Sequence, residues 1–288
     1  MPIGRSRLFA ELTGSPVFTL ETVNRYCNSA SVSKAAIQEL IKAGMVRMIR
    51  SGMYTCVCGR GGAPMADRFH IASILSGCSY ISHRSAVEYY GAYENPVHDV
   101  YVSSETPFDE FEFDGYRYRY IRPSITLGVR KAGHNNLISV TDRERTVLDS
   151  IKDMYRISGH GEVIAGIEAI KSLHEDKMLE YLEAYDDAFL YQKTGFILES
   201  VLGPIRNRTD LSERFFDICN KKSGETGRFL TGRISPGIYA PRWRLYIPYD
   251  FPLPIDPPST VRNGRSVNSR RFRKNSLCPD RGWTHERC

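Results

Sequence analysis

Long apolar runs are missing from this chain of 288 residues. No stretch approaches the roughly 18 consecutive apolar residues that a membrane helix needs. The first residues, MPIGRSRLFAEL, also lack the apolar core of a secretory signal peptide. These absences exclude a membrane-spanning protein, and we expect a cytoplasmic protein without a membrane partner.

Cysteine is scarce, and the number of cysteines is odd. A disulfide framework usually has an even number, and a zinc site needs ligands at short, regular spacings. Neither pattern is present among the seven cysteines, which are Cys27, Cys56, Cys58, Cys78, Cys219, Cys278 and Cys288. We therefore expect reduced thiols, no metal site and no cofactor.

The motifs of common enzymes are missing as well. The chain has no phosphate-binding GxxxxGK[ST] loop, and no Gly-x-Ser-x-Gly elbow surrounds His83. Carboxylates are plentiful, but none stands in the acidic-x-Lys strand element of a metal-dependent nuclease. We expect Glu144 and Asp149 to cap a helix or face solvent, and His83 to bond to backbone at a helix start. The sequence predicts no catalytic residue and no enzyme, with a metal-dependent nucleic-acid enzyme as an alternative.

Charge is distributed unevenly along the chain. Residues 1–60 contain 8 Lys and Arg against 3 Asp and Glu, whereas residues 61–259 contain 23 against 28. Residues 260–288 are basic again, with 8 against 2. A basic segment joined to an acidic one is typical of a nucleic-acid-binding domain attached to a different module.

Residues 16–57 have the pattern of a winged helix-turn-helix. Thr19 can cap a first helix, TLETVNRYC, and the polar residues 28–31 then turn the chain. The segment SVSKAAIQELIKAG predicts a second helix that ends at Gly44. The segment MVRMIRSGMYTCV predicts two short strands around Ser51-Gly52. Helical spacing in the second helix predicts a buried stripe of Val32, Ala36, Ile37, Leu40 and Ile41.

In such a unit the second helix enters the major groove of double-stranded DNA, and the hairpin lies along the backbone. Polar and amide side chains suit base edges, and arginines suit phosphates. If both hairpin arginines contact phosphates, replacing them should flatten the slope of log affinity against log salt by about two units. A helical pair used only for protein contacts is the alternative. The predicted DNA-binding residues are Ser31, Ser33, Lys34 and Gln38 on the helix, and Arg47, Arg50 and Tyr54 on the hairpin.

The rest of the chain predicts an α+β protein of three parts. A Gly-rich link at 59–64 separates the DNA-binding domain, residues 1–60, from a mixed α/β domain, residues 65–250. In this domain Asp114-Gly115 predicts a hairpin with interleaved Tyr and Arg, which either stack on bases or form a solvated sheet face. Residues from about 141 to 220 predict helices. The tail, residues 251–288, is basic and rich in Pro, Ser and Arg, which is typical of disorder.

Five segments together resemble the AbiEi-type antitoxins, a family of transcriptional regulators of viral defence systems. They are LIKAGMVRMIRSGMY, YISHRSAVEYYGAY, VTDRERTVLDSI, FLYQKTGFILESV and PRWRLYIP, in this order over about residues 6–250. One departure is Lys193-Thr194-Gly195, where the family has Leu-Gly before its last helix. This departure leaves the packing of that helix in doubt.

The resemblance implies a repressor of its own promoter that also neutralises a cognate nucleotidyltransferase-like toxin, without a stable complex with it. It implies that residues 65–250 provide the antitoxic function, but it assigns no individual residue to it. A winged-helix regulator that senses a small molecule is the alternative, because the aromatic residues of this region suit a binding pocket as well as a core.

Overall fold

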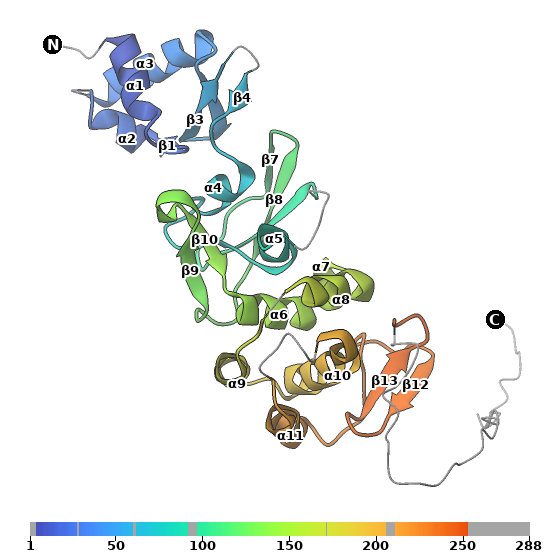
Figure 1. The fold of residues 1–288 in the computed structure, drawn as a ribbon. Helices are drawn as coiled ribbons and strands as arrows, with labels where there is room; N and C mark the ends of the chain where they lie inside the picture. Colours follow the sequence, from blue (N-terminus) through green and yellow to red (C-terminus); the bar gives the residue numbers. More distant parts are fainter. Residues whose placement is uncertain are drawn as a thin grey trace, which may run out of the picture. The chain divides into compact units, whose positions relative to one another are not determined.

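The computed structural model describes residues 4–27, 29–59, 62–91, 97–170, 172–205 and 211–252, without the side chains of 201–205. Helices and several separate sheets make an α+β protein (Figure 1). The described residues belong to one compact unit. The prediction of a disordered tail lies outside the described residues, apart from 251 and 252. Within the described ranges, no helix has both the length and the apolarity needed to cross a bilayer.

The N-terminal segment is three helices and a small sheet of order β1-β3-β2, with β4 paired to β3. Thr19 caps α2 by accepting the Thr22 N–H, as predicted, but this helix is shorter than the pattern suggested. Gly44 and Gly52 have positive φ angles of 70° and 78°, at the helix stop and the hairpin turn that the sequence predicts. The elements are α1 (Arg5–Leu12), β1 (Phe18–Thr19), α2 (Leu20–Asn24), α3 (Ala30–Lys42), β2 (Val46–Arg50), β3 (Met53–Cys58) and β4 (Ala63–Pro64).

The middle segment is built around a six-stranded mixed sheet of order β7-β8-β6-β5-β10-β9. Asp114 and Gly115 have φ angles of 53° and 82°, so they form the predicted two-residue hairpin turn. The elements are α4 (Arg68–Ala72), β5 (Tyr80–Ile81), α5 (His83–Tyr89), β6 (Asp99–Ser103), β7 (Phe111–Phe113), β8 (Tyr116–Ile121), β9 (Val129–Ala132), η1 (His134–Asn136) and β10 (Ile138–Thr141).

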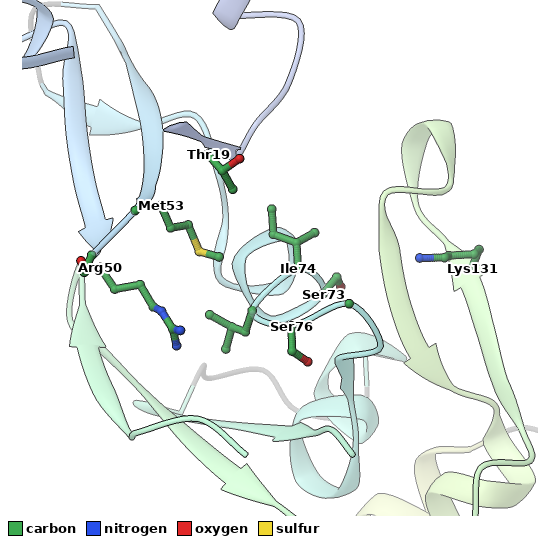
Figure 2. A pocket seen from close by; sticks show the side chains of 11 residues that line it. Thr19, Arg50, Met53, Ser73, Ile74, Ser76 and Lys131 are labelled. Carbon is green, nitrogen blue, oxygen red and sulfur yellow. The ribbon is translucent and has the colours of Figure 1, made fainter. Parts of the chain in front are cut away.

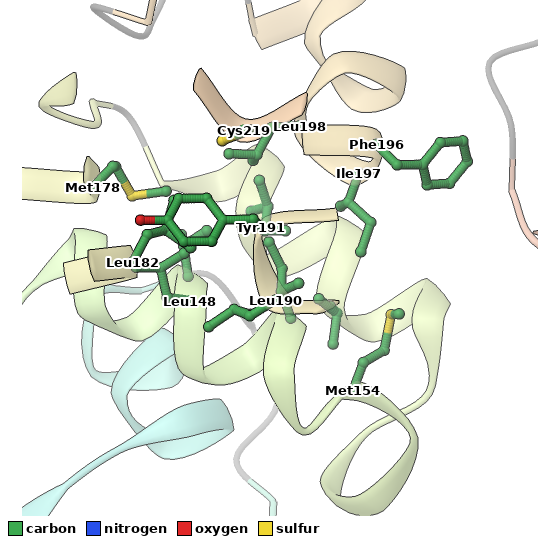
Figure 3. Close-up of a cluster of buried hydrophobic side chains, with 14 of the residues drawn as sticks. Leu148, Met154, Met178, Leu182, Leu190, Tyr191, Phe196, Ile197, Leu198 and Cys219 are labelled. Carbon is green, nitrogen blue, oxygen red and sulfur yellow. The ribbon is translucent and has the colours of Figure 1, made fainter. Parts of the chain in front are cut away.

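The C-terminal segment is mainly helical, as predicted, and ends in a three-stranded sheet of order β11-β13-β12. Its apolar side chains gather around α10 (Figure 3). The elements are α6 (Arg143–Lys152), α7 (Met154–Ile157), α8 (His160–Ala169), α9 (Glu175–Tyr185), α10 (Ala188–Ile205), α11 (Glu213–Lys222), β11 (Arg228–Phe229), β12 (Gly237–Ala240) and β13 (Leu245–Pro248).

Residues 193–195, where the sequence departs from the family pattern, lie inside α10 and not before the start of a helix. A Cβ added to Gly195 would lie 2.1 Å from the ring of Trp243, which is 2% exposed. The preceding Gln192 side chain donates to the Trp243 carbonyl at 2.6 Å. This part of α10 therefore packs directly on the Trp243 indole. The Lys193 side chain instead donates hydrogen bonds to carbonyls at the end of the neighbouring helix α6.

Three apolar clusters fill the compact unit, one for each segment. The boundary between the first two clusters does not coincide strictly with the predicted domain boundary at residues 59–64. Val17, Ile49 and Met53 come from the N-terminal segment, but they belong to the cluster of the middle segment. Because these side chains are buried among residues of the six-stranded sheet, the N-terminal segment is joined to the middle segment by core contacts as well as by the Gly-rich link.

Candidate nucleic-acid interface

Helix α3 exposes the polar face on which most of the predicted helix contacts stand. Ser29 caps the helix by accepting the Val32 N–H at 3.3 Å. Ile37 and Leu40 of the same helix are buried in the N-terminal cluster. Ser31, Lys34 and Gln38 are exposed on α3, and no partner in the described ranges holds the Lys34 or Gln38 side chain. These two long polar side chains are thus available to a ligand.

The predicted phase of α3 is wrong at its first turn. Ser33, predicted to face DNA, is 0% exposed, and its hydroxyl donates to the Ser29 carbonyl at 3.1 Å. Val32, predicted to be buried, is 43% exposed. The buried stripe runs Ser33, Ile37, Leu40, a spacing of four and three residues that matches one helical face. The apolar pattern alone included Val32, because a small serine was not recognised as a core-facing residue.

The side chains of both hairpin arginines already contact other residues of the protein. The Arg47 guanidinium donates to Asp114 Oδ1 at 2.8 Å and lies 4.7 Å from the ring centre of Phe113. The Arg50 guanidinium lies 5.7 Å from the ring centre of Phe111. All three partners belong to or join β7 and β8. The β2–β3 hairpin therefore contacts the middle segment with the two side chains that were predicted to contact phosphates.

Tyr54, the remaining predicted hairpin contact, is half-buried. Its ring stacks on Phe18 with 5.9 Å between the ring centres, and it packs against the N-terminal cluster. The ring therefore stabilises the pairing of β1 with β3.

A shallow cavity of about 450 Å³ lies between the hairpin and the loop that follows α4. Figure 2 shows Arg50 and Met53 on the hairpin side, with Ser73, Ile74 and Ser76 on the loop. Lys131 of β9 also lines it, and its ammonium donates to the Ser139 hydroxyl at 2.8 Å. The cavity marks where the hairpin meets the middle segment.

We expect the Arg47→Ala, Arg50→Ala double variant to change the slope of log affinity against log salt by less than about one unit. The physical reason is that both guanidinium groups, although partly open to solvent, already contact residues of the β7–β8 hairpin. The pair of Arg47 with Asp114 is exposed, so its loss should cost only about 1 kcal/mol or less of stability. Gel-shift titrations at several salt concentrations measure the slope, and a flattening by two units would contradict this placement.

The interleaved Tyr and Arg of the β7–β8 hairpin do not form an open stacking surface. Tyr118 is 0% exposed and stacks on Phe111 at 4.6 Å. Arg117 is paired with Glu112, and Arg119 with Asp99 and Glu110. Of the two interpretations that the sequence left open, the structure favours a sheet face on which each arginine is neutralised by a carboxylate.

The carboxylates considered for an enzyme are structural. Asp142 caps α6 by accepting the Arg145 N–H at 3.0 Å. The Arg145 guanidinium, 1% exposed, bonds to Asp149 at 3.0 Å. Glu144 accepts from the His174 backbone and ring. The expectation that Glu144 and Asp149 cap a helix or face solvent is thus wrong, because neighbouring elements cover α6.

His83 also differs from its prediction. Its Nδ1 is 2.8 Å from Ser82 Oγ and its Nε2 is 3.1 Å from Asp153 Oδ2, so its partners are side chains and not backbone. Such a Ser-His-Asp series resembles a hydrolase triad. However, Ser82 is 0% exposed and its hydroxyl is 2.7 Å from Ser103 Oγ. A substrate has no access to this serine, and the series joins β5 to α7.

Across the described ranges, no three His, Cys, Asp or Glu side chains gather in an arrangement suited to a metal ion. Within the same ranges the cysteines are free thiols. Burial raises the pKa of Cys56 to about 11, with a smaller contribution from Cys58. This thiol stays protonated at neutral pH, which makes it a poor metal ligand and a poor nucleophile.

Lys193, like Arg145, is a buried cation that the sequence did not indicate. Lys193 is 7% exposed, and its ammonium donates to the carbonyls of Ile151 and Lys152 at 3.0 and 2.7 Å. It thereby completes the C-terminal end of α6. In the sequence this position is marked by its departure from the family pattern. That departure raises a question about helix packing but does not indicate a buried charge.

Comparison with known proteins gives a fold likeness. No family model and no curated protein matches the chain. Among solved structures, it is similar to the crystal structure of the RV2827C protein from Mycobacterium tuberculosis, with a TM-score of 0.58 and 14% sequence identity. The match covers 84% of this chain and 90% of that chain. The two chains therefore share a fold over most of their length.

Proposed function

We propose that the chain is a DNA-binding autorepressor whose N-terminal segment, from α1 to β4, is a winged helix that presents α3 to the major groove of its own promoter. The observation that supports this most directly is the exposed, unpartnered pair Lys34 and Gln38 on a helix whose Ile37 and Leu40 are anchored in a core. An amide and an ammonium are groups that read base edges.

The hairpin has a different role in this proposal from the one that the sequence predicted. Arg47 and Arg50 hold β2 against β7 and β8, and Met53 and Ile49 add apolar contacts to the middle cluster. The hairpin then fixes the orientation of α3 on the rest of the protein. Phosphate contacts would come instead from exposed cations outside the hairpin, such as Arg5, Arg7 and Arg25.

We further propose that the region from α4 to β13 is an antitoxin that neutralises a nucleotidyltransferase-like toxin encoded beside it, without a stable complex. The support is the resemblance of five ordered segments to the AbiEi-type antitoxins. Their residues lie in α3 to β3, α5, α6, α10 and β13.

The test separates the two roles. A Lys34→Ala, Gln38→Ala chain should still rescue cells that express the toxin from a foreign promoter, because both side chains are exposed and form no hydrogen bond or ion pair with the other described residues. Toxin and antitoxin are placed on separate inducible plasmids, and colony survival is counted. If the double variant is present at normal levels but fails to rescue, neutralisation acts through DNA and the two-role proposal is wrong.

A regulator that senses a small molecule is the second candidate. It is favoured by a cavity of about 700 Å³ that is lined by cations and aromatic rings beside α7 and α10. Pockets of this size are ordinary for small ligands. The rescue experiment distinguishes the two candidates, since a pure sensor rescues no cell from the toxin.

A further inference from the structure

Most of the charged side chains that line the cavity beside α7 and α10 are positive. Four cations line it, Lys152, Arg156, Lys193 and Arg233, against two carboxylates, Asp153 and Asp187. The ring-bearing side chains Tyr155 and Phe189 line it as well. The residues come from the end of α6, from α7, from the start of α10 and from the loop after β11.

Both carboxylates are already engaged by the protein. Asp153 accepts from His83 Nε2, and the Lys152 and Arg156 cations lie 3.7 and 3.9 Å from it. Hydrogen bonding by His83 and the nearby charges outweigh burial and hold the pKa of Asp153 at about 2. Asp187 accepts the Phe189 N–H at 2.8 Å, at the start of α10. Both carboxylates still attract Lys193, but they are two against four cations, so the lining keeps an excess of positive charge.

Two of the cations keep donors for a ligand. The Lys193 side chain is more than nine-tenths buried, and two of its N–H bonds go to backbone carbonyls. An ammonium has three donors, so one is left at the cavity wall. The Arg233 side chain is exposed and meets no carboxylate in the described ranges. Burial lowers the pKa of Lys193 from 10.5 to about 8, so a bound anion would compensate a charge that is costly there.

We propose that this cavity binds a nucleotide, with a phosphate group between Lys193 and Arg233 and the base against Tyr155. Arg and Lys are the side chains that recognise phosphate. The Tyr155 ring is 40% exposed, so it offers a face to a planar ring. Phe189 is less suited to this, because the Lys193 and Arg228 cations already lie 5.0 and 5.2 Å from its ring centre. The site goes beyond the proposed function and does not depend on DNA binding.

The test is a calorimetric titration of the full chain with adenosine triphosphate. We expect saturable binding at one site, weakened about tenfold or more in Arg233→Ala and in Lys193→Met. Tyr155→Ala should weaken the nucleotide but leave any binding of inorganic phosphate unchanged. Arg233 is exposed, so its replacement should not disturb folding, and this variant remains informative if Lys193→Met unfolds.

Arg122→Ala and Lys221→Met are the matched controls, since both remove an exposed cation that does not line the cavity. They should bind the nucleotide as the unaltered chain does. The proposal is overturned if no saturable binding is found, if Arg233→Ala binds normally, or if the controls lose as much affinity. Inorganic phosphate that binds as tightly as the nucleotide would overturn the assignment of the base.

Discussion

Replacing Lys34 and Gln38 together with alanine should weaken specific operator binding by roughly 2–6 kcal/mol, which is about 30-fold at the least. The reason is geometric. Both side chains are exposed on α3, whereas Ile37 and Leu40 of the same helix are buried, and no hydrogen-bonding or ionic partner in the described ranges competes for them. A gel-shift titration against the promoter of the chain's own gene measures the loss.

Lys42→Ala is the control for this variant. It removes an equal charge from the same helix, but in the last turn, eight residues and therefore about 12 Å from Lys34. We expect a small loss of affinity that is similar for operator and unrelated DNA. Full operator affinity in the double variant, or an equal and specific loss in Lys42→Ala, would show that α3 is not the element that reads the sequence.

Leu148→Ala should lower the free energy of unfolding by about 2–5 kcal/mol. Leu148 is 0% exposed on α6 and belongs to the large cluster around α10 (Figure 3). A cavity at this place cannot collapse easily, because α6 is also fixed by the buried pair of Arg145 with Asp149 and by Lys193 at its end. Denaturant unfolding of the full chain gives the change.

The matched control is Leu127→Ala, the same replacement at a side chain that is 41% exposed. It should change stability by less than about 0.5 kcal/mol. In the two-plasmid assay, Leu148→Ala should abolish rescue while Leu127→Ala retains it. Normal stability of Leu148→Ala would contradict the packing described for α6, and full rescue by a destabilised chain would show that the antitoxic role does not need this core.

The elements that follow regular apolar periodicity were predictable. The sequence located α3, the hairpin at Ser51-Gly52, the hairpin at Asp114-Gly115 and the long run of helices after residue 141. Each has a strong local cause: a capping hydroxyl, a residue that tolerates positive φ, or apolar side chains three and four apart. The α+β class follows from these elements without any tertiary information.

The exact faces and partners were not predictable, and the candidate site shows why. Whether Ser33 or Val32 faces the core depends on a rotation of about 100°, which is decided by the packing of α3 against α1, α2 and β2. The helix α1 itself was not predicted. Its apolar residues Leu8 and Leu12 are too few to predict a helix on their own, and their role as core residues is apparent only from the N-terminal cluster.

For the charged residues, too, the sequence determined some features and the tertiary structure determined others. The sequence alone determined the positive charge of residues 1–60 and the cations that face outward from α3, because exposed charges need no particular partner. Only the tertiary structure decided that Arg47 and Arg50 meet β7 and β8, that Arg145 pairs in the core, and that Lys193 caps α6 beside a basic cavity. The physical reason is that an ion pair or a buried donor depends on residues distant in sequence, whose approach no local pattern encodes.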